Sequence, residues 1–183
     1  MDKPILSNDG IRLRAPEVSD LDFLFRMEND ESLWTVSCNS APYSRRQLKS
    51  YIEDSIHDIF SEHQVRFVIE WRDNVAGCID LTDADALQAR AQVGIALLPE
   101  FRGQGIASLA LQMICRYAES RLRMHQLYAL VPADNDSSLK LFRDNGFAEK
   151  GRLQEWLWAG ERFDDVIVFQ KIFSKKSSNC LPE

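Results

Sequence analysis

The chain lacks the features that define several large classes of protein. It has three histidines, and its four cysteines lie far apart without a C-x-x-C pair, so no residues have the spacing of a zinc site. No apolar run approaches the roughly 20 residues that span a bilayer. Residues 1–4 begin no signal-peptide segment. We therefore expect no metal, no membrane association and, because unpaired cysteines suit a reducing compartment, a cytoplasmic location.

The chain is acidic and has no basic tract, which makes it a poor candidate for a nucleic-acid-binding protein. The chain has 22 Lys and Arg against 28 Asp and Glu, a net charge of −6. Affinity for a phosphate backbone comes from Lys and Arg, so we expect no nucleic-acid partner, and a cationic substrate suits this chain better. With 183 residues, 45% of them hydrophobic, the chain can form one core. We predict a single domain over residues 1–173 and a polar, disordered tail over 174–183.

Hydrophobic periodicity predicts a chain that mixes strands and helices. The expected strands cover 11–14, 65–71, 75–81, 91–98, 127–131, 154–159 and 163–172. The expected helices cover 19–29, 45–61, about 106–122 and about 136–145, the first two beginning at capping boxes, 19–22 and 44–47. Some strands follow each other as hairpins and others are separated by helices. This order indicates an α+β (α/β layered) domain with a mixed sheet and helices on its faces.

One loop carries the pattern of an anion-binding site. The apolar strand 91–98 ends at Pro99, Gly103 and Gly105 follow, and a helix begins at once. The first turn of a helix presents unpaired N–H groups, and its dipole favours an anion there. From the spacing alone, a phosphate site and a tight turn whose glycines merely relieve strain remain equally open. The segment is neither a P-loop nor a Rossmann fingerprint, since it has no Gly-Lys-Ser/Thr and no third glycine.

The same loop resembles a known family signature. Arg102-x-x-Gly105-x-Ala107 is similar to the Arg/Gln-x-x-Gly-x-Gly/Ala signature of the GNAT superfamily of acyl-CoA N-acetyltransferases, and Pro-Glu-Phe precedes it at 99–101 as in that family. A second motif of the family is matched by Asn135, Ser138, Phe142 and Gly146-Phe147. The resemblance covers roughly residues 10–173. It implies a GNAT-like, mostly antiparallel seven-stranded sheet with helices on both faces and a V-shaped splay between strands 4 and 5.

The resemblance also implies which residues bind acetyl-CoA as cosubstrate. The pyrophosphate would lie on the backbone amides of Arg102, Gly103, Gln104, Gly105, Ile106 and Ala107. The pantetheine arm would pair like an added strand with Ile95, Ala96 and Leu97, and the N–H of Leu97 would polarise the thioester carbonyl. Asn135, which also suits a helix N-cap, would contact the pantetheine, with Ser138 and Phe142 nearby.

The reaction implied by the resemblance is direct attack of a primary amine on the thioester in a ternary complex. The amine must lose a proton, so a carboxylate or a water held by one is needed. Asp80 is the first candidate and Glu155 the second, with Glu100 and Asp83 also open; each also suits a solvated surface position. Phe142 stands where many relatives have a tyrosine that protonates the leaving thiolate. Either another group or water then takes that role, or the thiolate simply leaves. Tyr128 suits core packing better.

The acceptor remains open between a small-molecule amine and a protein N-terminus. The chain is similar to the spermidine N-acetyltransferase and ribosomal-protein N-terminal acetyltransferase branches through residues 77–81 and 160–165, but residues 37–43 lack the carboxylates of the polyamine branch. The alternative function is a non-catalytic acyl-CoA-binding module or sensor, which Phe142 supports; a dinucleotide-binding domain is disfavoured by the loop's position. Trp156 and Trp158 alternate on one strand face and suggest core packing or a homo-oligomer contact.

Overall fold

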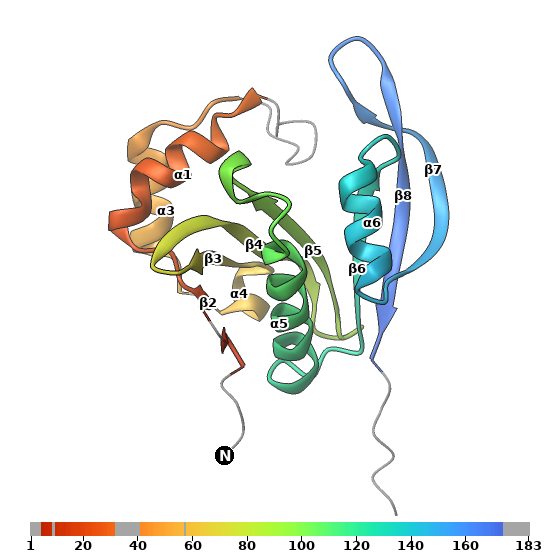
Figure 1. The fold of residues 1–183 in the computed structure, drawn as a ribbon, viewed down its shortest axis with the longest axis horizontal. Helices are drawn as coiled ribbons and strands as arrows, with labels where there is room; N and C mark the ends of the chain where they lie inside the picture. The colour runs from red at the N-terminus through yellow and green to blue at the C-terminus, as the bar shows by residue number, and fades with distance from the viewer. Residues whose placement is uncertain (1–4, 9, 32–40, 57, 174–183) are drawn as a thin grey trace, which may run out of the picture.

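The computed structural model describes residues 5–8, 10–31, 41–56 and 58–173. They form an eight-stranded sheet in the order β1-β2-β3-β4-β5-β6-β8-β7 (Figure 1). The strands are β1 (Ser7–Asn8), β2 (Ile11–Arg14), β3 (Val65–Trp71), β4 (Asn74–Asp85), β5 (Arg90–Leu97), β6 (Gln126–Pro132), β7 (Ala148–Trp158) and β8 (Phe163–Ile172). Every neighbouring pair is antiparallel except β5 and β6. The mixed, mostly antiparallel sheet is confirmed, and the two-residue β1 adds one strand to the seven expected.

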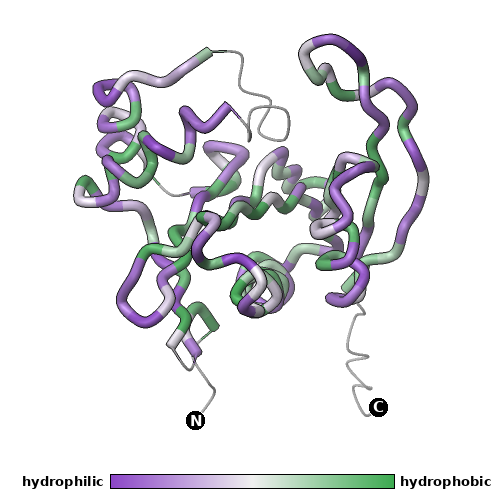
Figure 2. Tube along the Cα trace, turned by 45° about the horizontal axis from the view of Figure 1, so that its top comes forward, coloured by the Kyte–Doolittle hydropathy of each residue, from purple (hydrophilic) through white to green (hydrophobic). Residues whose placement is uncertain are grey.

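Helices cover both faces of this sheet, as predicted. They are α1 (Leu21–Glu28), α3 (Arg45–Asp54), α4 (Ile59–Glu62), α5 (Ile106–Ser120) and α6 (Asp136–Asp144), with 3₁₀ turns η1 (Val18–Asp20) and η2 (Pro99–Phe101). Helices α1 and α3 pack on one face over Val68 and Cys78. Helix α5 packs on the other face over Ile79 and Leu81. Figure 2 shows hydrophobic residues concentrated along the central strands and α5, with hydrophilic residues toward the outer loops.

The strand expected over 154–159 begins earlier, as β7 at Ala148, because its first residues pair with β8. Two helix boundaries differ for local reasons. The helix expected over 45–61 is two helices, because the Asp58 carboxylate accepts the Phe60 N–H (3.2 Å) and starts α4 anew. The capping box expected at 19–22 is replaced by one that begins earlier, where Asp20 accepts the Glu17 N–H (2.7 Å). The box at Ser44 is confirmed, since Ser44 and Gln47 exchange hydrogen bonds.

The sheet opens between β5 and β6. These parallel strands pair only from Arg90 to Gln92, with Gln126 to Tyr128. Within the described residues, β5 has no β6 partner from Val93 onward, and Figure 1 shows the two strands diverging. The V-shaped splay predicted between strands 4 and 5 is therefore confirmed at β5 and β6.

Some expectations lie on residues outside the described part of the chain. These are the tail over 174–183, Cys38, Cys180 and most of the segment 37–43. Among the helices of the described ranges, none is long and apolar enough to cross a bilayer.

Candidate active site

The glycines of the loop after β5 hold a conformation that other residues adopt rarely. Gly103 and Gly105 have φ values of +74° and +80°, in the left-handed region. A Cβ built on either glycine meets no atom within 4 Å, so the space above the loop is open. Helix α5 begins directly after Gly105. The glycines therefore turn the chain sharply and leave room for a ligand against the backbone.

The backbone amides of this loop are largely without internal partners. The N–H of Arg102 donates to the carbonyl of Pro99 (3.2 Å), and the N–H of Leu109 donates to Gly105 (3.2 Å). For the N–H groups between them, residues 103–108, no acceptor is found within the described ranges. Free N–H groups at a helix N-terminus attract an anion. The geometry fits a pyrophosphate, with Gly103 to Ser108 as its donors and the Arg102 amide already used.

The end of β5 presents unpaired backbone groups on the open side of the sheet. Leu98 N–H donates to the Ala76 carbonyl on β4 (2.9 Å), and backbone groups alternate in direction along a strand. Ala96, paired with Cys78, therefore also points to β4. Ile95 and Leu97 point into the V between β5 and β6. Of the three residues predicted to pair with pantetheine, Ile95 and Leu97 thus have the required direction, whereas Ala96 does not.

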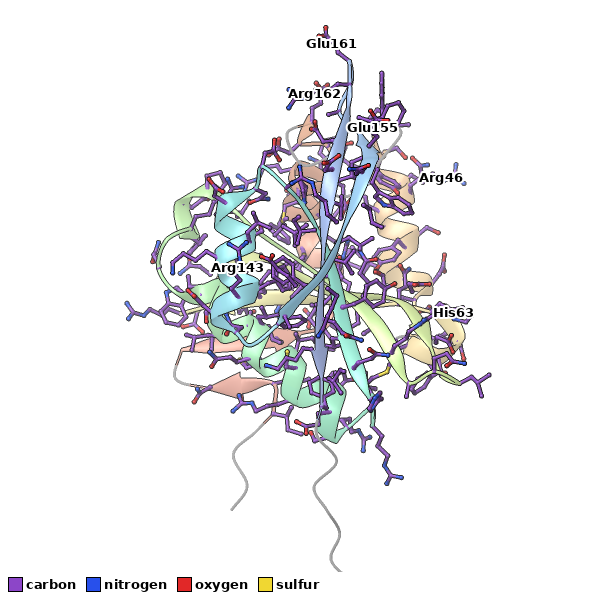
Figure 3. All side chains as sticks on the ribbon, turned by 90° about the vertical axis from the view of Figure 1, so that its right-hand side faces the viewer. Arg46, His63, Arg143, Glu155, Glu161 and Arg162 are labelled. Carbon is purple, nitrogen blue, oxygen red and sulfur yellow. The ribbon has the colours of Figure 1, made fainter. Side chains whose placement is uncertain are left out.

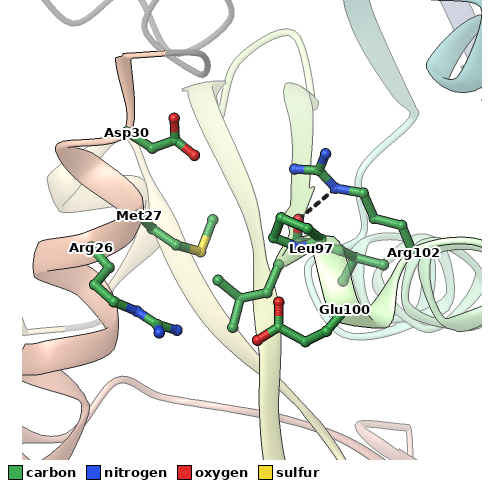
Figure 4. Close-up of a pocket in the computed structure, with 8 residues that line it drawn as sticks. Arg26, Met27, Asp30, Leu97, Glu100 and Arg102 are labelled. Atoms are coloured by element: carbon green, nitrogen blue, oxygen red, sulfur yellow. Dashed lines mark hydrogen bonds between the residues drawn. The ribbon is translucent and has the colours of Figure 1, made fainter.

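A side-chain hydrogen bond links this strand end to the loop. Arg102 Nε donates to the carbonyl oxygen of Leu97 at 3.0 Å (Figure 4). The Leu97 carbonyl is thereby satisfied, and its N–H is left to donate into the V. This is the arrangement expected of a donor to the thioester carbonyl.

A pocket of about 210 Å³ lies between α1 and the loop. Its lining residues are Arg26, Met27, Asp30, Leu97, Leu98, Pro99, Glu100 and Arg102. In Figure 4, Arg26, Met27 and Asp30 approach from the α1 segment, opposite Leu97, Glu100 and Arg102. Of the predicted carboxylates, Glu100 is therefore the one that shares this pocket with Leu97.

The second motif mainly supports the start and the packing of α6. The Asn135 side-chain oxygen caps α6 by accepting the Ser138 N–H (3.1 Å), which confirms the N-cap role. Phe142 is 4% exposed, and its ring contacts Phe147 and Phe169, with centroids 5.1 and 5.7 Å away. Such a ring has little surface left for a cofactor, so the cofactor contact expected of Phe142 finds no support in its position.

Asp80, the first candidate for the general base, is held in an ion pair. Arg66 donates to both of its carboxylate oxygens, from Nε (3.0 Å) and Nη2 (2.8 Å), and also to Glu28 on α1. Burial by itself lowers the pKa of Arg66, but Asp80 and Glu28 raise this pKa well above its usual value, so the guanidinium stays charged. Both carboxylate oxygens of Asp80 are therefore occupied by this guanidinium. Sequence reasoning missed Arg66 because the pair depends on the β3–β4 register.

The other carboxylates considered for proton transfer, apart from Glu100, lie away from the pocket. Glu155 lies on the exposed β7, toward the turn of the β7–β8 hairpin near Glu161 and Arg162 (Figure 3). Asp83 accepts a hydrogen bond from the Tyr128 hydroxyl. Burial, together with Asp83, raises the pKa of Tyr128, which makes that phenol a weaker acid. Cys78 and Cys115 are buried, and burial raises the pKa of both thiols.

Comparison with known proteins agrees with this geometry. The sequence profile of the acetyltransferase (GNAT) domain family matches residues 11–148. A spermidine N(1)-acetyltransferase of Vibrio cholerae is 28% identical over 87% of this chain and 91% of that protein. A ribosomal-protein-serine acetyltransferase of Escherichia coli is 32% identical over 60% of this chain and 62% of that protein.

Solved structures show the same fold. Spermidine N-acetyltransferase from Vibrio cholerae, solved in complex with CoA and spermine, superposes with a TM-score of 0.81 at 25% identity. The superposition covers 90% of this chain and 96% of that one. Because the family profile matches most of the chain, this protein belongs to the GNAT family of N-acetyltransferases.

Proposed function

We propose that this enzyme transfers an acetyl group from acetyl-CoA to a primary amine of a polyamine by direct attack. The proposal rests on two adjoining features. One is the open edge of β5 at Ile95 and Leu97, and the other is the row of free amides over 103–108. These two features suit the pantetheine and pyrophosphate of an acyl-CoA. The relatives support the same cosubstrate and acceptor class.

The residues of the V act chiefly by position and electrostatics. Ile95 holds the pantetheine by backbone hydrogen bonds, and the Leu97 N–H stabilises negative charge on the thioester oxygen. The amine nitrogen bonds to the acetyl carbon, the carbon–sulfur bond breaks, and the amine proton leaves. The thiolate takes up a proton from water, since Phe142 has none to give.

The proton acceptor is a water or carboxylate that reaches the mouth of the V. Glu100 is the strongest protein candidate, because it lines the pocket with Leu97 and its carboxylate makes no ion pair with a described residue. Asp80 is assigned a positioning role instead, because Arg66 occupies both of its oxygens.

Release of CoA, followed with a thiol reagent over a panel of amines, tests this proposal. The panel contains spermidine, spermine, a peptide with a free N-terminal serine, and free amino acids. We expect turnover with the polyamines at the highest kcat/KM. Faster turnover of the peptide would favour the protein N-terminal reaction. Tight acetyl-CoA binding without turnover of any amine would instead indicate an acyl-CoA sensor.

A homo-oligomer is the assembly that the surface supports. Trp156, Trp158 and Phe163 of the β7–β8 hairpin are each more than half exposed, which rules out the core-packing interpretation for the tryptophans. The rings of Trp158 and Phe163 lie 5.0 Å apart and form one apolar patch. A spermidine N-acetyltransferase of Vibrio cholerae is a dodecamer in one of its structures. A cytoplasmic location remains a prediction from the unpaired cysteines.

A further inference from the structure

Gly94 is a glycine that neither the backbone nor the packing requires. It lies inside β5 and pairs with Asp80 of β4, and its φ is outside the left-handed region, so any residue could adopt this conformation. A Cβ built on Gly94 meets no atom within 4 Å. Gly77, by contrast, must be glycine, because a Cβ there would come within 2.2 Å of the Ala96 carbonyl oxygen. Gly94 is exposed, and we call the open space over it the gap.

The position of this gap relates it to the reaction. Side chains of directly paired residues share a face, so Gly94 and Asp80 face the same side, the side of Cys78, α1 and α3. Ile95, the next residue, directs its backbone into the V. On the β6 side the strands have already separated, since their last pair is Gln92 with Tyr128. The gap thus lies next to Ile95, where the edge proposed for the pantetheine begins, and three residues before Leu97.

The charges near the gap suit a positively charged chain. Asp80 pairs with Gly94 across the β4–β5 ladder, and the carboxylates of Asp80 and Glu28 both bind Arg66 on β3. These three groups carry a net negative charge. An aliphatic amine that crosses Gly94 would gain from this charge, while a branched or bulky acceptor would need more room than one missing side chain provides.

We propose that Gly94 is a specificity-determining residue, whose missing side chain leaves the groove by which an extended alkylamine acceptor crosses β5 to the thioester. This inference rests on the proposed function and adds to it the route and shape of the acceptor. A side chain at position 94 should affect binding of the acceptor rather than of acetyl-CoA. The donors proposed for the pyrophosphate lie at 103–108, beyond the end of β5.

The test is a size series, Gly94→Ala, Gly94→Val and Gly94→Leu, assayed with acetyl-CoA and spermidine. Gly151→Leu is the matched control, because Gly151 also lacks a neighbour within 4 Å and a left-handed φ but lies on β7. We expect kcat/KM for spermidine to fall with side-chain size, at least thirtyfold for Gly94→Leu. The Kd for acetyl-CoA should stay within twofold, and Gly151→Leu should match the wild type.

A bisubstrate probe, spermidine joined to the sulfur of CoA through an acetyl bridge, gives a readout that needs no turnover. The wild type should bind this probe more tightly than CoA, and Gly94→Leu should lose that advantage. If the wild type acetylates spermidine and Gly94→Leu does so equally well, the inference is overturned and the proposed function stands. A tenfold weaker acetyl-CoA Kd in Gly94→Leu would also overturn it by assigning the gap to the cosubstrate. An inactive wild type would overturn the proposed function and this inference together.

Discussion

Arg102 and Leu97 join the two parts of the cosubstrate site, since the Nε of Arg102 donates to the Leu97 carbonyl oxygen at 3.0 Å. The loop that carries the free amides is therefore fixed to the end of the strand that faces the V. This side-chain contact adds to the backbone hydrogen bonds of η2, which also join the end of the strand to the loop.

Replacing Arg102 by Lys should loosen this link without removing the charge. Lysine is a flexible point charge and lacks the planar fork that reaches the carbonyl. One such hydrogen bond contributes roughly 1–2 kcal/mol, so we expect acetyl-CoA affinity to fall about fivefold to thirtyfold. Calorimetry measures the change, with Arg116→Lys on the exposed side of α5 as control. Equal affinities for the two variants would exclude a positioning role for Arg102.

Substitution at Gly105 should distinguish charge from backbone strain. Asn tolerates a positive φ better than most residues, and Asp has nearly the same shape with a negative charge added. We expect Gly105→Asn to weaken acetyl-CoA binding moderately and Gly105→Asp to weaken it at least tenfold further, because a carboxylate would face the phosphates. Titrations in low and high salt measure both effects. If the two variants bind alike, the loop does not hold the pyrophosphate.

Asp80→Asn should separate a structural from a catalytic role. Loss of a general base commonly lowers the rate by ~10²–10⁴. Because Arg66 holds both oxygens of Asp80, we expect a fall in kcat below tenfold, an unshifted pH profile and a lower melting temperature. Glu100→Gln, tested in parallel, should reduce kcat more than Asp80→Asn does. A hundredfold loss in Asp80→Asn with an unchanged melting temperature would restore Asp80 as the base.

The ion pair of Arg14 and Asp20 should make stability depend on acid pH. Burial by itself raises the pKa of Asp20, but hydrogen bonds from Arg14 (2.6 and 2.8 Å) and from the Glu17 N–H outweigh it. The pKa therefore lies below the ordinary 3.8 in the folded state. The stabilisation is present above about pH 4 and is lost as the pH falls through the folded-state value.

Thermal unfolding from pH 7 to pH 2 tests this dependence, with Asp20→Asn as comparison. The variant should lose about 1–3 kcal/mol at pH 7, since a buried hydrogen-bonded charge is removed. It should then lose less than the wild type on acidification. Parallel curves for the two proteins would show that Asp20 does not cause the acid sensitivity.

Local patterns in the sequence predicted most of the fold. The strand–glycine–helix junction at Gly103 and Gly105 was visible because glycine spacing and helix starts are properties of neighbouring residues. The same holds for the Ser44 capping box. The extension of β4 to Asp85 was missed, because its polar end is a strand only through pairing with Arg90.

The parts of the site that the sequence could not predict depend on contacts between distant elements. Arg66 meets Asp80 across two strands and Glu28 on a helix, which no spacing rule reveals. Phe142 matched the family motif, yet the packing of α6 turns its ring toward Phe147 and Phe169. The direction of Ala96 followed only from the register of β5 on β4.

Because β5 pairs with β6 over only a few residues, the backbone amides of β5 differ in whether they have a hydrogen-bond partner. The N–H groups of Gly94, Ala96 and Leu98 are directed to β4, whereas those of Ile95 and Leu97 face the V. In deuterated water, adjacent residues of β5 should therefore exchange at rates that alternate along the strand. Acyl-CoA bound in the V would slow the exchange of the Ile95 and Leu97 protons and leave the exchange of the other three unchanged.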